Sequence, residues 1–228
     1  MMKQAVIIYG PPGSGKGTQA ELLARKFGLV HFDTGRFIES VVHDKSADRD
    51  PVLRRERKLF DSGKLCTPAW VFRITSAAVR NIAGAGFGIV FSGSPRTEFE
   101  AFGSEKQEGL VAILEKLYGK KNISVFSLAV KEQSSIRRNS SRFVCSVCGL
   151  PILARAKEKR CALCAGPMRT RTLDNPAVIK VRLKEYEERT APILKRMRKQ
   201  GLHIFTINGE PLPYLVFRDI AKRLDGNA

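Results

Sequence analysis

Residues 5–18 read Ala5-Val-Ile-Ile-Tyr9-Gly10-Pro-Pro-Gly-Ser-Gly-Lys-Gly-Thr18, an apolar run followed directly by a glycine-rich loop. A short apolar run bounded by turn residues is typical of a buried strand. Glycines allow successive backbone N–H groups to turn inward around an oxyanion. Lys16 adds a positive charge, and a helix that starts here presents the positive end of its dipole. The stretch therefore predicts a phosphate-binding loop between a strand and a helix, in a protein that binds nucleotides.

The residue order in this loop differs from the general phosphate-loop pattern. That pattern places Ser or Thr directly after the lysine, whereas here Gly17 separates Lys16 from Thr18. The alternative is a glycine-rich turn that only joins two elements, and the strand–loop–helix setting disfavours it. The residues expected to contact the phosphates are Gly13, Ser14, Gly15, Lys16, Gly17 and Thr18.

The composition indicates a globular protein with a large excess of positive charge. The chain has 228 residues, a formal net charge of +18 and 43% hydrophobic residues. No apolar run approaches the roughly 20 residues that span a bilayer, and the first run is too short for a secretory signal, so we expect a cytoplasmic protein. Residues 131–200 hold 18 Lys/Arg against 6 Asp/Glu. We expect this segment to attract polyanions such as nucleotide phosphates, RNA or an acidic membrane surface.

Four of the five cysteines form two close pairs, Cys145-x-x-Cys148 and Cys161-x-x-Cys164. Two such pairs at short separation are typical of a structural zinc site, because each tight turn offers two thiolates to one tetrahedral ion. The alternatives are two disulfides or four unliganded thiols, and disulfides are rare in a reducing compartment. Four protein sulfurs leave no open coordination position, so zinc bound here would be structural rather than catalytic. Cys66 is expected to be a small buried residue.

Strand-like runs alternate with helical patterns along the chain, which predicts an α/β protein with a parallel sheet and crossover helices. Residues 139–173 are basic, contain the four cysteines and lack helical periodicity, so they are expected to form a small zinc-bound module. The expected strands are Ala5–Tyr9, Leu29–Phe32, Gly88–Phe91, Ile123–Val130 and His203–Ile207. The expected helices are Gly15–Phe27, Gly35–His43, Pro51–Asp61, Pro68–Ile82, Glu105–Leu117, Pro176–Lys199 and Pro213–Leu224.

Taken in order, these motifs resemble the adenylate kinases, a family of nucleoside monophosphate kinases, and in particular the bacterial-type members with a zinc-bearing lid. The resemblance covers almost the whole chain, and the phosphate loop with Gly between Lys and Thr is that family's version. The matching pieces are GPPGSGKGTQA at 10–20, FGLVHFDTG at 27–35, GKL at 63–65, SGSPRT at 92–97, the cysteine pairs, and RLKEYEERTAPIL at 182–194.

The resemblance implies a P-loop core with a central parallel sheet of five strands, a helical insertion and a zinc-ribbon lid. The core is expected at residues 1–32, 65–138 and 175–228. The insertion, expected to bind the nucleoside monophosphate (NMP), covers residues 33–64, and the lid covers residues 139–174. The expected protein is a monomer.

The resemblance also implies reversible transfer of the γ-phosphoryl group of Mg²⁺-bound ATP to an NMP, most simply AMP, giving two ADP. Such transfer requires positioning, charge neutralisation and exclusion of water more than covalent work by the protein. The catalytic residues carried over from the family are Lys16, Arg96, Arg142, Arg171 and Arg182. Arg138 and Arg142 are assigned to ATP, Arg138 stacking on its base. The residues assigned to the NMP are Thr34, Gly35, Arg36, Leu65, Gly93, Arg96 and Glu100.

Several positions depart from the family pattern, and several of these departures fall on the acceptor and metal side. The family's Thr-Gly-Asp-x-x-Arg appears as Thr34-Gly35-Arg36-Phe37-Ile38-Glu39, and one hypothesis is that Arg36 takes over the phosphate contact while Glu39 balances it. Ser92 replaces an aspartate that orients magnesium-bound water, and Asp33 is the candidate replacement. Leu173 replaces the first of two lid aspartates and leaves Asp174.

Glu100 replaces a glutamine that contacts the acceptor adenine in the family. A carboxylate offers only hydrogen-bond acceptors, so it favours a base with exposed N–H groups, such as guanine or cytosine. A kinase with another monophosphate substrate (GMP, CMP or UMP) is therefore one alternative. The other is a degenerate kinase fold that binds RNA nonspecifically through its basic zinc lid, although Phe143 is the only aromatic residue there.

Overall fold

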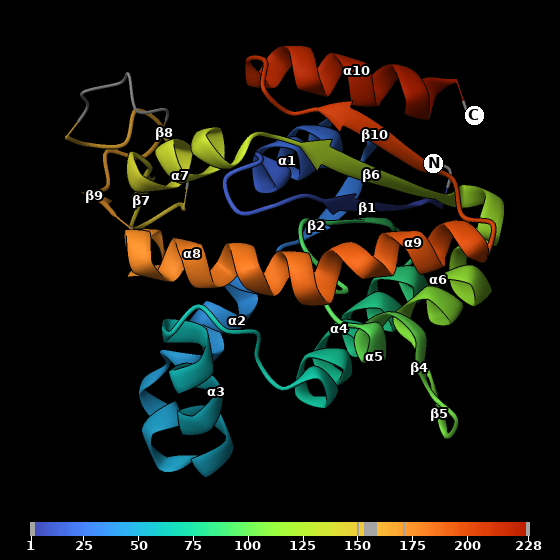
Figure 1. Ribbon diagram of the computed structural model, residues 1–228, viewed down its shortest axis with the longest axis horizontal. Coiled ribbons are helices and arrows are strands. Elements are labelled where there is room, and N and C mark those ends of the chain that lie inside the picture. Colours follow the sequence, from blue (N-terminus) through green and yellow to red (C-terminus); the bar gives the residue numbers. More distant parts are fainter. Residues whose placement is uncertain (1–2, 150, 153–158, 171, 227–228) are drawn as a thin grey trace.

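A five-stranded parallel sheet forms the centre of the computed structural model, which describes residues 3–149, 151–152, 159–170 and 172–226 (Figure 1). The strand order is β10-β6-β1-β3-β2. The central β1 pairs in parallel with β3 on one side and with β6 on the other. The expected parallel sheet of an α/β fold is confirmed. The strands are β1 Ala5–Tyr9, β2 Leu29–Phe32, β3 Gly88–Phe91, β6 Ile123–Ala129 and β10 Ile204–Asn208.

Helices cover both faces of the sheet, because successive residues of a buried strand point to opposite faces. In β1, Ile7 joins one apolar cluster and Ile8 joins the other. The cluster around Ile8 packs against α1 (Lys16–Phe27) and α10 (Pro213–Asp225), which lie on the same side of the sheet in Figure 1. The cluster around Ile7 packs against α4 (Pro68–Gly84), α6 (Leu110–Tyr118) and α9 (Ala191–Lys199).

The helical insertion, residues 33–64, extends below the sheet in Figure 1. It contains α2 (Thr34–Val42), a 3₁₀ turn (Lys45–Arg49) and α3 (Pro51–Asp61). The side chain of Asp50 accepts hydrogen bonds from the backbone N–H groups of Val52 and Leu53, which caps the start of α3. The apolar side chains of the insertion belong to a third cluster, separate from the two clusters on the central sheet.

The cysteine module, residues 139–174, follows α7 (Glu132–Ser140) and contains a small antiparallel sheet. Its strand order is β8-β7-β9, with β7 at Phe143–Cys145, β8 at Pro151–Ile152 and β9 at Met168–Arg169. A 3₁₀ turn at Thr172–Asp174 ends the module and leads into α8 (Pro176–Glu185). Asn175 caps α8 by accepting a hydrogen bond from Ala177 N–H.

Two expected helices differ from the structure. The helix expected at 105–117 begins only at Leu110, because Gly103 has a φ of +75° and residues 103–108 form a short hairpin of β4 (Gly103–Ser104) and β5 (Gln107–Glu108). The helix expected at 176–199 contains a π turn, Tyr186–Thr190, between α8 and α9. The short helix α5 (Glu98–Phe102) and the 3₁₀ turn Lys120–Asn122 complete the elements.

Among the described residues, no helix combines the length and the apolar character needed to cross a membrane.

Candidate active site

The phosphate loop connects the end of β1 to the start of α1, at the edge where the parallel strands end. Gly13 and Gly15 have φ values of +78° and +96°, which side chains rarely adopt. A Cβ atom on Gly13 would lie 2.5 Å from Asn139 Nδ2, so glycine also allows α7 to pack against the loop. The hydroxyl of Ser135, which also belongs to α7, donates to Pro12 O in the loop. The phosphate loop is therefore supported by α7, and the N-terminus of α1 stays open.

Lys16, the first residue of α1, lies at the centre of several positive charges. Its Nζ donates to Gly10 O at 2.7 Å and to Pro11 O at 2.9 Å. Burial of the ammonium group, together with the charges of Arg96, Arg182 and Arg142, holds the pKa of Lys16 well below its ordinary value. The structure thus brings together four of the five cations expected to be catalytic. The fifth, Arg171, lies outside the described residues.

Arg96 joins two neighbouring pockets, since it lines both of them. Its Nε donates to Gly93 O at 2.5 Å. Gly93 has a φ of +119°, and a Cβ atom there would lie 2.8 Å from the guanidinium. The first pocket also contains Lys16 and Arg182, and the second contains Thr34, Gly35 and Glu100. Leu65 lines both pockets, so the residues assigned to the two nucleotides meet around Leu65 and Arg96.

Asp174 gathers two of the site arginines. Its side chain is 2% exposed and accepts two hydrogen bonds from Arg142, at 2.9 and 2.5 Å. Arg182 Nη1 lies 3.8 Å from the same carboxylate and donates to Leu173 O at 3.3 Å. A bidentate arginine–carboxylate pair fixes the plane of the guanidinium. Asp174 therefore holds in place two cations whose charges act on Lys16.

Arg138, expected to stack on the donor base, holds the loop after β10. It donates to Gly209 O and Glu210 O, both at 2.8 Å. These contacts place Arg138 beside the segment that leads into α10, next to the phosphate loop. The expected stacking stays a prediction.

The second pocket contains polar atoms that lack partners. Thr34 Oγ1 and Ser94 Oγ are both buried, and the described part of the structure offers neither of them a hydrogen bond. A buried polar atom without a partner is costly unless a ligand or water satisfies it. Ile38 and Phe60 supply an apolar side to the same pocket. The pocket therefore suits a ligand with both apolar and polar surface, as a nucleotide has.

Glu100 lines this pocket but is also part of a helix cap. Its Oε1 accepts from Thr97 Oγ1 at 2.8 Å and its Oε2 accepts from Arg96 N–H at 2.9 Å. Thr97 Oγ1 in turn accepts from Glu100 N–H, so the two residues form a reciprocal cap at the start of α5. Burial raises the pKa of the Glu100 carboxyl.

Arg36, the swapped residue of the acceptor motif, contacts the cysteine module. Its guanidinium donates to Cys148 O at 3.2 Å, a partner 112 residues away in the sequence. The predicted contact of Arg36 with the acceptor phosphate stays a prediction.

The two residues considered for the magnesium side, Asp33 and Ser92, lie in different settings. Asp33 caps α2 by accepting from Arg36 N–H at 3.1 Å, and its charge faces Lys16. Ser92, which stands where the family has an aspartate, shares a 2.9 Å hydrogen bond with His31 Nε2. The Nδ1 of His31 lies 3.2 Å from Glu21, so the imidazole is held from both sides.

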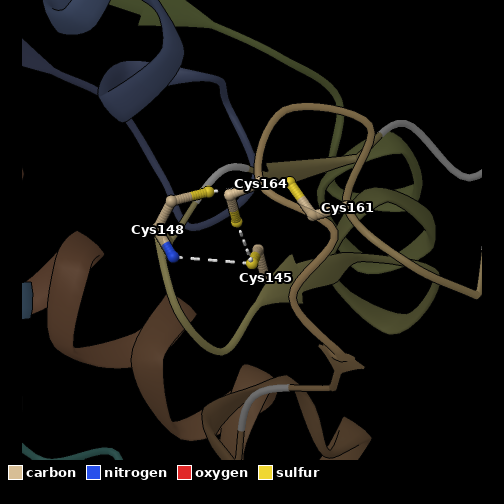
Figure 2. Close-up of side chains that lie close together, drawn as sticks. All are labelled: Cys145, Cys148, Cys161 and Cys164. Carbon is tan, nitrogen blue, oxygen red and sulfur yellow. Dashed lines mark hydrogen bonds between the residues drawn. The ribbon is translucent and has the colours of Figure 1, made fainter.

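The four module cysteines lie in one cluster (Figure 2), with all four sulfur atoms within 4.8 Å of one another. Cys145 Sγ is 3.5 Å from Cys164 Sγ, and Cys148 Sγ is 3.6 Å from Cys161 Sγ. Disulfide sulfurs lie about 2.05 Å apart, whereas Zn–S bonds of about 2.3 Å in a tetrahedron separate sulfurs by roughly 3.8 Å. The cluster therefore fits a zinc ion, and the cysteines are free rather than paired as disulfides.

Backbone amides around the cluster also favour thiolates. The N–H groups of Val147 and Cys148 both point to Cys145 Sγ at 3.4 Å, and Leu163 N–H points to Cys161 Sγ at the same distance. Hydrogen bonds led by that from Cys148 N–H lower the pKa of Cys145 to about 6. This donor set is typical of zinc knuckles.

Sequence reasoning missed several residues that line the pockets. Glu185 and Tyr186 lie three and four residues after Arg182, on the same helical face, so helical spacing from Arg182 could have found them. Ser94 and Cys66 line the second pocket without any periodic signal in the sequence.

Comparisons with known proteins agree with the site. The adenylate kinase family profile matches residues 8–202. The chain belongs to the adenylate kinase family. It is thus a nucleoside monophosphate kinase, and the resemblance seen in the sequence is confirmed.

Three bacterial relatives, each called adenylate kinase, extend this match across the chain. The Chlamydia pneumoniae protein is 31% identical over 95% of both chains. The Pelobacter propionicus protein is 32% identical over 97% of this chain and 96% of its own. The Novosphingobium aromaticivorans protein is 32% identical over 86% of this chain and 88% of its own. The matched region therefore covers most of the length of each of these relatives.

Proposed function

We propose that this adenylate kinase transfers the γ-phosphoryl group of Mg²⁺-bound ATP reversibly to AMP, yielding two ADP. One AMP phosphate oxygen forms a bond to the γ-phosphorus while the bond from that phosphorus to the β–γ bridging oxygen breaks. No covalent enzyme intermediate is involved. The observation that carries the proposal is the convergence of Arg96, Arg142 and Arg182 around Lys16, next to a second pocket that shares Arg96.

On the donor side, we assign ATP phosphates to the loop amides of residues 13–18 and to Lys16. The Lys16 ammonium now donates to two loop carbonyls, and a phosphate oxygen is a stronger acceptor than either. Arg142 and Arg182 stabilise the charge of the transferring group, and Asp174 holds them in position. We place Arg138 beside the donor base, and Mg²⁺ enters as part of the substrate, with Asp33, whose charge acts on Lys16, as the candidate carboxylate.

On the acceptor side, we assign the monophosphate to Arg96, whose guanidinium can hold two phosphate oxygens at once. Gly93 leaves the space that this guanidinium occupies. Thr34, Gly35 and Leu65 supply the wall of the acceptor pocket, and the unpartnered hydroxyl of Thr34 is available to the ligand. Glu100 lines the same pocket at the position where the family contacts the acceptor base.

We further propose that the cysteine module is a zinc-bound lid held by Cys145, Cys148, Cys161 and Cys164. The described part of the module contributes few residues to a core, so a metal is the natural source of its rigidity. Zinc would supply structure and no catalytic step, because all four positions are filled by sulfur. The protein is proposed to act as a monomer, with the helical insertion at 33–64 as the acceptor-binding part.

The experiment that tests the function is a panel of phosphoryl-transfer assays with Mg²⁺-ATP and AMP, GMP, CMP or UMP. We expect AMP to be phosphorylated with the highest kcat/KM. A preference for GMP or CMP would keep the kinase chemistry and reassign the acceptor through Glu100. No transfer to any of the four monophosphates, with ATP binding intact, would refute the proposed function.

A further inference from the structure

Three residues that depart from the family pattern, Arg36, Glu39 and Leu173, all lie where the helical insertion meets the cysteine module. Arg36 and Glu39 belong to α2, and Leu173 belongs to the 3₁₀ turn at the end of the module. Arg36 and Glu39 contact the cysteine module, and Leu173 contacts the helical insertion. We call these three residues the seam.

Arg36 contacts the turn that carries the first cysteine pair. Its Nη2 donates to Cys148 O at 3.2 Å. The next residue, Gly149, has a φ of +71°, and a Cβ atom there would lie 2.6 Å from the guanidinium carbon. The guanidinium therefore lies directly against the glycine, and a side chain at this position would have to displace it. A metal held by Cys148 would fix this backbone and, through it, the position of Arg36.

Glu39 contacts the strand that ends the module. Its carboxylate lies 3.4 Å from Arg169 Nη2, and its side chain is 17% exposed. Arg36 and Glu39 are three residues apart, so they lie on the same face of α2. That face therefore presents one positive and one negative charge to the module. The Arg36 guanidinium meets the Cys148 carbonyl, and the Glu39 carboxylate meets the Arg169 guanidinium. The exchange of charges relative to the family pattern suits these partners.

Leu173 supplies the apolar part of the seam. Its side chain is 5% exposed and belongs to the cluster formed by Ile38, Val42 and Phe60 of the helical insertion. An aspartate at this position would place a charge inside that cluster, at a large cost. Leu173 also precedes Asp174, which orients Arg142 and Arg182. The seam is thus linked on one side to the arginines and on the other to the acceptor pocket.

We propose that Arg36, Glu39 and Leu173 are positioning residues that couple the zinc-binding turn to the acceptor pocket. The coupling runs through α2, whose first residues, Thr34 and Gly35, line that pocket. A metal bound to the cysteines thereby favours the α2 position that binds the monophosphate, and by reciprocity the monophosphate tightens binding of the metal. This inference rests on the proposed function only for the identity of the monophosphate.

The first test measures zinc release from the zinc-loaded, full-length protein into a chromogenic chelator without nucleotide. We expect Arg36→Ala to release zinc about threefold to tenfold faster than wild type, because it removes a charged donor from the Cys148 carbonyl. Arg36→Lys, which keeps the charge but not the planar fork, should fall between the two. Arg49→Ala is the matched control, since Arg49 is an exposed arginine of the same insertion and belongs to its 3₁₀ turn. Equal release rates in Arg36→Ala, Arg36→Lys and wild type would overturn the proposal.

The second test measures the coupling from the acceptor side. Saturating AMP should slow zinc release from wild type by about threefold, and Arg36→Ala or Leu173→Ala should reduce that effect. Leu173→Met, which keeps the apolar volume, should restore it.

In kinetic assays the seam variants should raise KM for AMP while KM for ATP and kcat change little. If AMP is phosphorylated normally but does not alter zinc release in wild type, the coupling is wrong and the proposed function stands. If no monophosphate is phosphorylated while Arg36→Ala still accelerates zinc release, the seam stands and the proposed function fails.

Discussion

The donor and acceptor halves of this molecule relate differently to the family pattern. The donor half, built from the phosphate loop, Lys16 and the start of α1, matches the family in residue type and spacing. The acceptor half keeps the pocket and Arg96 but differs at Arg36, Glu39 and Glu100. A polyphosphate requires the same amide and cation geometry in every such enzyme. The acceptor half can exchange charges wherever a neighbouring element supplies a matching group, as the cysteine module does.

The largest expected effect tests the donor half. Lys16→Met should lower kcat/KM by about 10³-fold or more, because one preorganised charge at the transferring group is worth at least about 10²–10³. Lys26→Ala is the control, since Lys26 is an exposed lysine on the same helix and pairs with Asp225 at 2.8 Å. Steady-state kinetics with ATP and AMP provide the measurement. Turnover near wild type in Lys16→Met would contradict the donor-site assignment.

The next effect separates the module from the sheet. Chelation of zinc, or Cys145→Ser, should leave backbone amides of β7 and β9 exchanging rapidly, because metal binding supplies much of the folding free energy of such modules. Amides of β1 and β6 should stay protected, since their apolar clusters do not involve the module. Hydrogen exchange read out by mass spectrometry measures both regions in one sample. Protection in the module that persists in the metal-free protein would count against the zinc assignment.

A smaller effect concerns the acceptor base. Glu100→Gln replaces one acceptor oxygen of the carboxylate by an NH₂ group, so KM for AMP should fall by about threefold to tenfold. The variant also loses a contact with either Arg96 N–H or Thr97, which should lower the free energy of unfolding by about 1 kcal/mol. Acceptor kinetics and denaturant unfolding measure the two effects separately. Unchanged KM values for AMP, GMP and CMP together would remove Glu100 from the base site.

The smallest expected effect is proton uptake by Lys16 when ATP binds. Free Lys16 has a lowered pKa, and bound phosphates favour its charged form, so ATP binding should take up a fraction of a proton. Because binding takes up protons, ATP affinity should fall as the pH rises through the lowered pKa of free Lys16. Calorimetric titration in buffers of different ionisation enthalpy measures the uptake. Lys16→Met should show none, and equal uptake in wild type and variant would assign the proton to another group.

Sequence reasoning was strongest where a feature depends on neighbouring residues. The five strands, the phosphate loop and the cysteine pairs are each encoded in a few consecutive residues, and the structure places the strands almost at the expected bounds. It was weakest where partners are distant along the chain. Arg36 meets Cys148 across 112 residues, and no local pattern indicates that contact. The helix expected from residue 105 failed for a local reason, since its apolar periodicity begins only at Leu110 and Gly103 turns the chain.

The π turn at Tyr186–Thr190 has a consequence for how the long C-terminal helical segment works. Before the turn, Arg182 and Glu185 line the reaction pocket, and after it, Ile193 and Met197 pack under the sheet. Thr190, within the turn, donates to Arg96 O at 2.9 Å. An α-helix advances about 100° per residue, and the wider π turn changes this angle locally. The residues before and after the turn can therefore face two differently oriented surfaces within one continuous helical segment. Deleting a single residue there would rotate the distal half out of alignment with the sheet and withdraw the support of Arg96 at the same time.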